Sequence, residues 1–305
     1  MSEEYQYIQL VKDILEKGTW ENGRNGTTKG IFGYTMRYSL ADNTIPIFTI
    51  KKTAWKTCLK ELLWFIRGET NNKLLQQQNV HIWDGNTSRE FLDSVNLPLY
   101  EEGIAGPIYG YQWRHFGAKY NCIDGKPISK NFKENDLNRN DEIYLGIDQL
   151  KEIIDCLKDP NKRSSRRLIM TAWNPLQLKQ MALPPCHVMC QFNVHDGNKL
   201  SCALFQRSND VSLGTSFNVA SYSFLTHLLA KHCGLIAHEF IHFMGNCHIY
   251  EEHIQPMEEI LRREPYPFPK INILEVKENI NDYELSDFEI IDYRSHDVIK
   301  MSMIA

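Results

Sequence analysis

One segment of the chain brings a cysteine, an arginine and several hydrogen-bonding side chains close together in sequence. Cys186 follows two prolines, and Arg207 stands at the end of an apolar run further along. The thiolate is the reactive form of cysteine, and a nearby guanidinium stabilises it. We therefore interpret Cys186 as a candidate nucleophile that Arg207 activates. A small core thiol is the alternative for any single cysteine.

Asn218 lies between Phe217 and Val219, ahead of an apolar helical segment. Its carboxamide offers a donor side and an acceptor side, which match a ring with adjacent N–H and C=O groups. An aspartate at this position would match a differently substituted ring. The pattern predicts recognition of a small polar ring, with a helix N-cap as the simpler alternative.

Three arginines have no matching acidic residues nearby in sequence. Arg166 and Arg167 end a basic run, and Arg24 lies in a Gly-rich stretch. Guanidinium groups match phosphate oxygens in a bidentate geometry. The three arginines are therefore candidate phosphate ligands, and a solvated basic turn is the alternative for the pair.

Residues 238–242 read His-Glu-Phe-Ile-His and match a zinc-hydrolase motif that requires a helix. Nearby glycines leave little room for that helix, and the apolar residues favour a strand. Strand positions four apart are separated by roughly 13 Å, too far to share one ion. We expect no metal site here, and Cys186, His187 and Cys190 also lack a second ligand pair.

Hydrophobic periodicity predicts an α/β protein that positions these residues. Helical segments are expected over residues 5–18, 53–67, 74–78, 147–157 and 220–233, and strands over residues 34–50, 167–173, 186–194, 199–206, 239–244 and 271–276. Glu61 interrupts the apolar pattern of residues 53–67, where a buried carboxylate needs a partner or a function. A helix-surface carboxylate is the alternative. Residues 23–33 are expected to form a loop, and residues 119–145 a surface insertion.

Composition limits the classes of protein that fit. The chain has 305 residues, 42% of them hydrophobic, and a net charge of −4, so nucleic acid is not an expected partner. The N-terminus does not resemble a secretory signal, and no apolar run approaches the roughly 20 residues that span a bilayer. The eight cysteines are then expected to be reduced thiols in the cytoplasm, with nuclear or organellar locations left open.

Taken together, these motifs resemble those of the folate-dependent thymidylate synthases with a cysteine nucleophile. The most specific segments are residues 61–65, 106–110, 112–114, 182–187, 206–208, 217–222, 248–250 and 263–269. The resemblance implies one α/β (α+β) domain over residues 1–305, with a large twisted mixed sheet that helices cover on one face. The sheet would pack against its partner in a homodimer. The implied reaction converts dUMP to dTMP with 5,10-methylenetetrahydrofolate as one-carbon donor and reductant.

The resemblance also implies roles for individual residues. Cys186 would attack carbon 6 of the uracil ring, and the other catalytic residues would be Glu61, Tyr109, His187, Arg207, Asp210 and Asn218. The nucleotide would be bound by Arg24, Gln206, Arg207, Ser208, Asp210, Asn218, His248 and Tyr250, and by Arg166 and Arg167 from the partner subunit. Folate would contact Trp83, Asn86, Asp210, Leu213, Gly214, Phe217, Tyr250, Met303 and Ile304. Residues 300–305 would close over it as a lid, and no metal is implied.

The chain departs from the family pattern at a few positions. Thr215-Ser216 replaces the usual Val-Pro, Asn246-Cys247 stands where Asp-Ala is common, and the loop after Arg24 is one residue short. None of these changes removes a proposed catalytic group. The main alternative is a dUMP hydroxymethylase of the same superfamily, which traps the one-carbon unit with water instead of hydride.

Overall fold

The computed structural model describes residues 2–23, 25–120, 122–123, 126–127 and 145–303. The chain forms two compact units, which are described separately below. Unit 1 comprises Met1–Leu59, Ile154–Ile169 and Cys186–Ala305, and unit 2 comprises Lys60–Ile153 and Met170–Pro185. The expectation of one catalytic domain over residues 1–305 stays a prediction.

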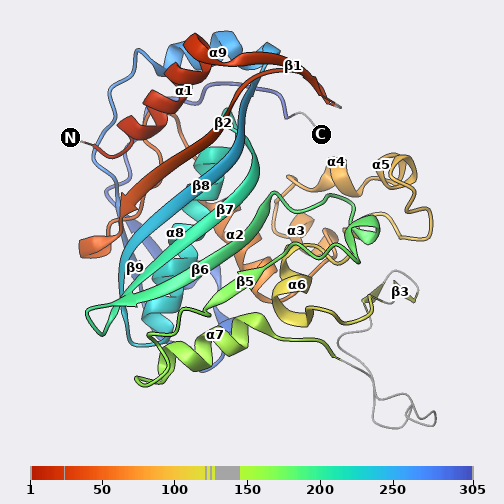
Figure 1. The fold of residues 1–305 in the computed structure, drawn as a ribbon, viewed down its shortest axis with the longest axis vertical. Coiled ribbons are helices and arrows are strands. Elements are labelled where there is room, and N and C mark those ends of the chain that lie inside the picture. The colour runs from red at the N-terminus through yellow and green to blue at the C-terminus, as the bar shows by residue number, and fades with distance from the viewer. Residues whose placement is uncertain (1, 24, 121, 124–125, 128–144, 304–305) are drawn as a thin grey trace. The chain divides into compact units, whose positions relative to one another are not determined.

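Unit 1 is built around a mixed sheet with the strand order β1-β2-β8-β7-β6-β5 (Figure 1). In this order the strands are Thr19–Gly23, Gly26–Ser39, Ile236–Tyr250, Lys199–Asp210, His187–His195 and Ile169–Thr171, the last of which continues into unit 2. Strands β7 and β8 run parallel, whereas β1–β2, β2–β8 and β6–β7 are antiparallel pairs. This six-stranded sheet with its helices confirms the predicted α/β class.

The two faces of this sheet differ in burial, because side chains alternate along each strand. One face carries apolar residues that are fully buried, including Met36, Phe192, Leu204 and Phe240. Helix α8, Gly214–His232, packs against β7 and β8 and lies behind the sheet in Figure 1. The opposite face, which we call the open face, leaves large apolar side chains in contact with solvent.

The other elements of unit 1 support the ends of this sheet. Helix α1 spans Tyr5–Lys17 and packs against β2, and helix α9 spans Ile254–Ile260. Strands β9 and β10, Lys270–Ile273 and Phe288–Ile291, form a separate antiparallel pair. Short 3₁₀ turns occupy Ala41–Asn43, Glu251–His253, Ile280–Asp282 and Leu285–Asp287.

Unit 2 consists mainly of short helices. They are α2 Trp55–Ile66, which begins in unit 1, α3 Lys73–Gln76, α4 Asp84–Thr87, α5 Arg89–Ser94, α6 Tyr109–His115 and α7 Gln149–Lys158, which continues into unit 1. A 3₁₀ turn covers Leu178–Gln180, and β3 Cys122–Ile123 pairs with β4 Lys126–Pro127. Helix α6 approaches α2 closely, because a Cβ on Gly110 would lie 2.8 Å from Phe65 Cα. Only glycine fits this contact.

Most predicted elements are present, but three expectations were wrong. The loop predicted over residues 23–33 is largely strand instead, because Gly23 ends β1 and residues 26–33 belong to β2, which pairs with β1. The strand predicted over residues 34–50 ends at Ser39, where Asp42 and Asn43 turn the chain with positive φ. Helix α8 begins at Gly214, ahead of the predicted start at Ala220. Most of the predicted insertion over residues 119–145 lies outside the described residues.

No helix of the described chain is long and apolar enough to cross a membrane.

Candidate active site

Cys186 and Arg207 lie on adjacent segments of unit 1. Cys186 directly precedes β6, and Arg207 lies on β7. The backbone N–H of Arg207 donates to the carbonyl oxygen of Cys186 over 2.9 Å, and the next pair in the ladder is His187 with Gln206. Cys186 is partly exposed and is not part of a disulfide bond. The strand pairing thus brings the candidate nucleophile and its predicted activator onto neighbouring backbones.

Two glycines allow the strands to approach closely around these residues. A Cβ on Gly245 of β8 would lie 2.8 Å from the carbonyl oxygen of Arg207. A Cβ on Gly30 of β2 would lie 2.9 Å from the carbonyl oxygen of Cys247 and 3.3 Å from Cβ of His248. Any larger residue at either position would displace the backbone that carries Arg207 or His248.

Asn218 lies inside helix α8, so the N-cap alternative for this residue is wrong. Its Oδ1 accepts a hydrogen bond from Gln206 Nε2 over 2.9 Å. Its Nδ2 is 2.7 Å from His187 Nε2. The structure therefore brings together an amide from β7, an amide from α8 and an imidazole from β6.

His187 is neutral at physiological pH in this environment. Burial lowers the pKa of its imidazole to about 4, and the hydrogen bond with Asn218 only partly opposes this effect. A neutral imidazole carries one proton, so its Nε2 can accept the hydrogen bond from Asn218 while Nδ1 is protonated. His187 is then suited to orient neighbours and water instead of providing a positive charge.

Asp210 ends β7 and begins the turn into α8. Its Oδ1 accepts from the backbone N–H groups of Ser212 over 2.9 Å and Leu213 over 3.4 Å. Thr215 then donates its hydroxyl to Asn209 Oδ1 over 2.7 Å. These bonds explain how α8 begins at Gly214, and they give the buried Thr215 hydroxyl the partner that it needs.

His248 and Tyr250 lie near the end of β8. His248 Nδ1 is 2.8 Å from Asn246 Oδ1, and the rings of His248 and Tyr250 pack edge to face with centroids 5.3 Å apart. Burial lowers the pKa of His248, while the negative charge of Asp210 opposes that shift. Asn246 stands where the family commonly has an aspartate, and it therefore keeps a hydrogen-bond acceptor beside the imidazole of His248.

Two further residues, Tyr7 and Lys51, contact the turn after Asp210 and were missed by sequence reasoning. Tyr7 donates its hydroxyl to the carbonyl oxygen of Val211 over 2.7 Å, and Lys51 Nζ donates to the carbonyl oxygen of Ser212. Burial raises the pKa of the Glu4 carboxyl to about 7 and lowers the pKa of Lys51 to about 8. Tyr7 lies on α1 and is fully buried.

Glu4 holds the segment that carries Lys51. Its carboxylate accepts from the backbone N–H groups of Thr49 over 2.7 Å and Ile50 over 3.0 Å. The one sequence signal for this contact is that Glu4 is an acidic residue directly ahead of an apolar helix.

In unit 2, Glu61 lies in an aromatic environment. Its Oε1 accepts from Trp83 Nε1 over 2.7 Å. Burial raises the pKa of the Glu61 carboxyl to about 7, and the hydrogen bond with Trp83 partly opposes this shift. Tyr109 packs edge to face on Trp83 with ring centroids 6.2 Å apart. Its ring is tilted against that of Phe65, with centroids 4.9 Å apart. The alternative of a solvated helix-surface carboxylate is therefore wrong for Glu61.

Asn86 lies on α4, which other side chains of unit 2 hold in place. Asp84 Oδ1 accepts from Asn72 Nδ2 and Gln76 Nε2, each over 2.8 Å. These bonds connect α4 to the start and end of α3, and Trp83 directly precedes the helix that carries Asn86.

The remaining predicted residues are spread over unit 1. Ser208 pairs with Asn246 across β7 and β8, and Leu213, Gly214 and Phe217 lie at the start of α8. Arg166 and Arg167 are exposed ahead of β5. The structure does not bring these two arginines into contact with Asn218 within one chain. Met303 is exposed, whereas Arg24 and Ile304 lie outside the described residues.

The segment with the zinc-like motif is part of strand β8, as predicted. His242 contacts Gln206, and His238 lies 3.8 Å from Glu239. Within the described ranges, no group of three or more His, Cys, Asp or Glu side chains could hold a metal ion.

The fold and this geometry define the chain as an α/β protein with a thiol-centred candidate site. A family model described as Thymidylate synthase matches residues 5–305. Human Thymidylate synthase is 46% identical over 301 residues, which cover 98% of this chain and 90% of that protein. The chain therefore belongs to the thymidylate synthase family.

Longer relatives match the same region. The Bifunctional dihydrofolate reductase-thymidylate synthase of Paramecium tetraurelia is 47% identical over 304 residues, covering 99% of this chain and 61% of that protein. The protein of the same name from Zea mays is 46% identical over 302 residues, covering 99% and 54%. The chain thus spans little more than half the length of these bifunctional relatives.

Proposed function

We propose that the protein is a thymidylate synthase that converts dUMP to dTMP with 5,10-methylenetetrahydrofolate and releases dihydrofolate. The observation that carries this proposal is the arrangement next to Cys186. A partly exposed thiol precedes a strand whose first residue, His187, is hydrogen-bonded to the amide of Asn218. A nucleophile beside a donor and acceptor pair suits a reaction on a pyrimidine ring.

The Cys186 thiolate adds to carbon 6 of uracil in this proposal, and carbon 5 becomes nucleophilic as a result. Arg207 stabilises the thiolate and contributes to phosphate binding with Ser208. Asn218 donates to and accepts from the ring edge, and His248 and Tyr250 bind the deoxyribose hydroxyl. The neutral imidazole of His187 supports this geometry without adding a charge next to the thiolate.

In this proposal, Glu61 donates and accepts protons together with Tyr109 and ordered water. A carboxyl with a pKa of about 7 is present in both protonation states near neutral pH, which suits a general acid and base. The contact with Trp83 also connects Glu61 to the proposed folate contacts, because Trp83 and Asn86 belong to that set.

The C-terminal segment closes over the bound folate in this proposal and excludes water. His253 Nε2 is 3.0 Å from the carbonyl oxygen of Ser302, which holds the chain just ahead of Met303. The folate contacts in unit 1 are Leu213, Gly214, Phe217 and Tyr250, and the folate itself supplies the one-carbon unit and the hydride.

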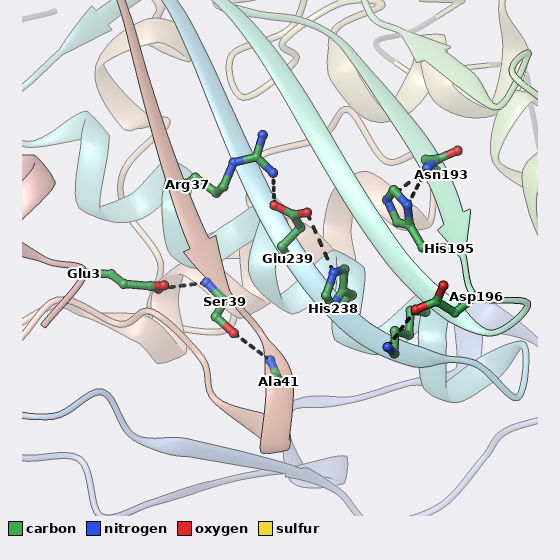
Figure 2. A network of polar contacts seen from close by, with 10 residues as sticks. Glu3, Arg37, Ser39, Ala41, Asn193, His195, Asp196, His238 and Glu239 are labelled. Atoms are coloured by element: carbon green, nitrogen blue, oxygen red, sulfur yellow. Dashed lines mark hydrogen bonds and ion pairs between the residues drawn. The ribbon is translucent and has the colours of Figure 1, made fainter. Parts of the chain in front are cut away.

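We also propose that the open face of the sheet packs against a second copy of the chain. Phe205 and Phe243 are 44% and 43% exposed and are paired neighbours on β7 and β8. Adjacent exposed aromatic rings on a sheet are typical of an interface. Near the end of the same face, Figure 2 shows Arg37 paired with Glu239, which supplies a polar border.

The exposed Arg166 and Arg167 would then bind phosphate in the partner's site. Mixing Cys186→Ala subunits with Arg167→Ala subunits should restore activity in heterodimers, since one site per dimer keeps both groups.

Sedimentation should show that Phe243→Asp weakens the dimer, whereas Leu99→Asp, at an exposed leucine of unit 2, should not. An unchanged dimer with Phe243→Asp would contradict this interface.

We propose a reducing, cytoplasmic location for the protein. None of the seven cysteines whose side chains the structure describes is part of a disulfide bond. Free thiols are typical of reducing compartments.

Product analysis tests the proposed reaction directly. The purified protein, dUMP and methylenetetrahydrofolate should yield dTMP and dihydrofolate, detected by mass and by absorbance. A hydroxymethylated nucleotide with tetrahydrofolate would instead identify a hydroxymethylase. Absence of any nucleotide product from a folded, dUMP-binding protein would contradict both reactions.

A further inference from the structure

A buried histidine continues the hydrogen-bonded chain behind Asn218. His242 lies on β8 and is fully buried, on the face of the sheet that also buries Phe240 and Met244. Its Nε2 is 2.7 Å from Gln206 Oε1. The chain of contacts therefore runs from His242 through Gln206 and Asn218 to His187.

A backbone carbonyl determines the direction of this chain. Gln206 Nε2 donates to the carbonyl oxygen of Ser208 over 2.9 Å. A carbonyl oxygen can only accept a hydrogen bond, so it must face the NH₂ group of Gln206. The Oε1 atom of Gln206 must then face His242, and this contact requires a proton on His242 Nε2.

The same reasoning determines the orientation of Asn218. The second N–H of Gln206 Nε2 points to Asn218 Oδ1, so Asn218 Nδ2 faces His187. His187 Nε2 must then be the acceptor. Every contact in the chain has one donor and one acceptor only in this orientation, and buried mismatches are costly.

The protonation of His242 agrees with this direction. Burial lowers the pKa of His242 to about 3, so the imidazole is neutral and carries one proton. His242 Nδ1 is buried and has no hydrogen-bond partner among the described residues. A proton on Nδ1 would leave a buried donor unpaired and would set two acceptors, Nε2 and Gln206 Oε1, against each other.

We propose that His242, together with the carbonyl of Ser208, is a specificity-determining positioning residue that fixes the amide orientation of Asn218 and so favours uracil over cytosine. This inference rests on the proposed function. Uracil presents an N–H and a carbonyl oxygen where cytosine presents a ring acceptor and an amino group. A reversed Asn218 amide would match cytosine, but it would oppose the amide of Gln206 donor to donor.

Loss of His242 therefore weakens discrimination without removing a group that touches the ring. Without the His242 donor, Gln206 Oε1 is buried and unpaired in the native orientation. The free-energy gap between the two amide orientations then narrows by about the value of one hydrogen bond. The affinity for cytosine nucleotides therefore increases relative to the affinity for uracil nucleotides.

Nucleotide binding by the full-length protein tests this role. The ratio of the dCMP to the dUMP dissociation constant should fall about tenfold in His242→Phe, which keeps the ring size but has no donor. His242→Gln supplies an N–H at a similar reach and should restore most of the ratio. His227→Phe is the matched control, because His227 is also buried and its Nε2 is 2.9 Å from the carbonyl oxygen of Thr44.

Nitrogen-15 NMR of labelled histidine tests the donor and acceptor order of these hydrogen bonds in the unmodified protein. His242 should carry its proton on Nε2 and His187 on Nδ1. The opposite tautomer at either residue would overturn the proposal, and this measurement decides the question if His242→Phe does not fold.

The outcomes separate this inference from the proposed function. A wild-type protein without preference for dUMP would overturn the proposed function and this inference with it. A wild-type preference for dUMP that His242→Phe leaves unchanged, or that His227→Phe reduces equally, would overturn the role of His242 alone.

Discussion

In unit 1, the buried polar side chains around Asn218 are neutral and pair with one another, whereas unit 2 holds one ionisable carboxyl among aromatic rings. Burial lowers the pKa of His187 to about 4 and of His242 to about 3. Burial raises the pKa of Glu61 to about 7. The same physical cause, loss of water around a charge, therefore has opposite uses in the two regions.

The neutral side chains around Asn218 have fixed hydrogen-bond donors and acceptors, which suits recognition of a ring edge. A carboxyl that titrates near neutral pH can exchange protons, which suits the chemical steps. The comparison predicts that changes to the polar side chains around Asn218 alter which nucleotide binds, whereas changes at Glu61 alter the rate.

The largest effect is expected for Cys186→Ala. Turnover should be abolished, because the substitution removes the thiol that forms the proposed bond to carbon 6, while dUMP should still bind to the polar side chains around Asn218. Assays and calorimetry on the same preparation measure both. Cys156→Ala, at another partly exposed thiol, should remain active. Residual turnover by Cys186→Ala near the wild-type rate would refute the nucleophile assignment.

Glu61→Gln should reduce turnover by about 10²- to 10⁴-fold, the usual contribution of a general acid or base. The amide keeps the size of the side chain and can still contact Trp83, so dUMP binding should change little. Steady-state kinetics and binding measurements separate the two quantities. A loss of dUMP affinity with an unchanged rate would reverse the roles assigned to the two regions.

Asn218→Asp should shift nucleotide preference towards dCMP by at least about tenfold, because the substitution changes the donors and acceptors that face the ring. Competition between dUMP and dCMP for the wild-type and variant proteins measures the shift. If the preference stays the same, the ring is read by other residues.

A further effect concerns stability. A raised pKa of Glu61 in the folded protein means that its contribution to stability is complete below the ordinary value of 4.5 and is lost as pH rises through about 7. Relative to Glu61→Gln, the wild type should lose about 2–3 kcal/mol of unfolding free energy between pH 4 and 8. Denaturant unfolding at several pH values measures this difference.

Glu102→Gln, at an exposed glutamate of unit 2, is the control for this measurement. Its unfolding free energy should follow the wild-type pH dependence. Parallel curves for the wild type and Glu61→Gln would show that Glu61 ionises as it does in water.

Periodicity predicted the elements whose apolar faces are continuous. Residues 53–67 match helix α2, which ends just before Gly68 at a φ of 71°. Residues 239–244 match the centre of β8, where Phe240 and Met244 alternate with more exposed residues. These patterns are local, so the sequence alone is sufficient to identify them.

The hairpin of β1 and β2 was missed for a physical reason. All five residues of β1 are exposed, so their types follow no apolar alternation. Backbone pairing of β2 with β8 holds this hairpin in the sheet. Pairing between distant segments leaves little trace in the composition of an exposed strand.

The chemical types at the candidate site, the order of most elements and, through the motifs, the family could all be predicted from the order of residues. The direction of the hydrogen bonds from His242 to Asn218, the pKa of Glu61, and the contacts of Glu4 and Lys51 could be read only from the folded chain. Donor direction and charge state depend on neighbours far apart in sequence and on the removal of water. Neither is set until the strands and helices have packed.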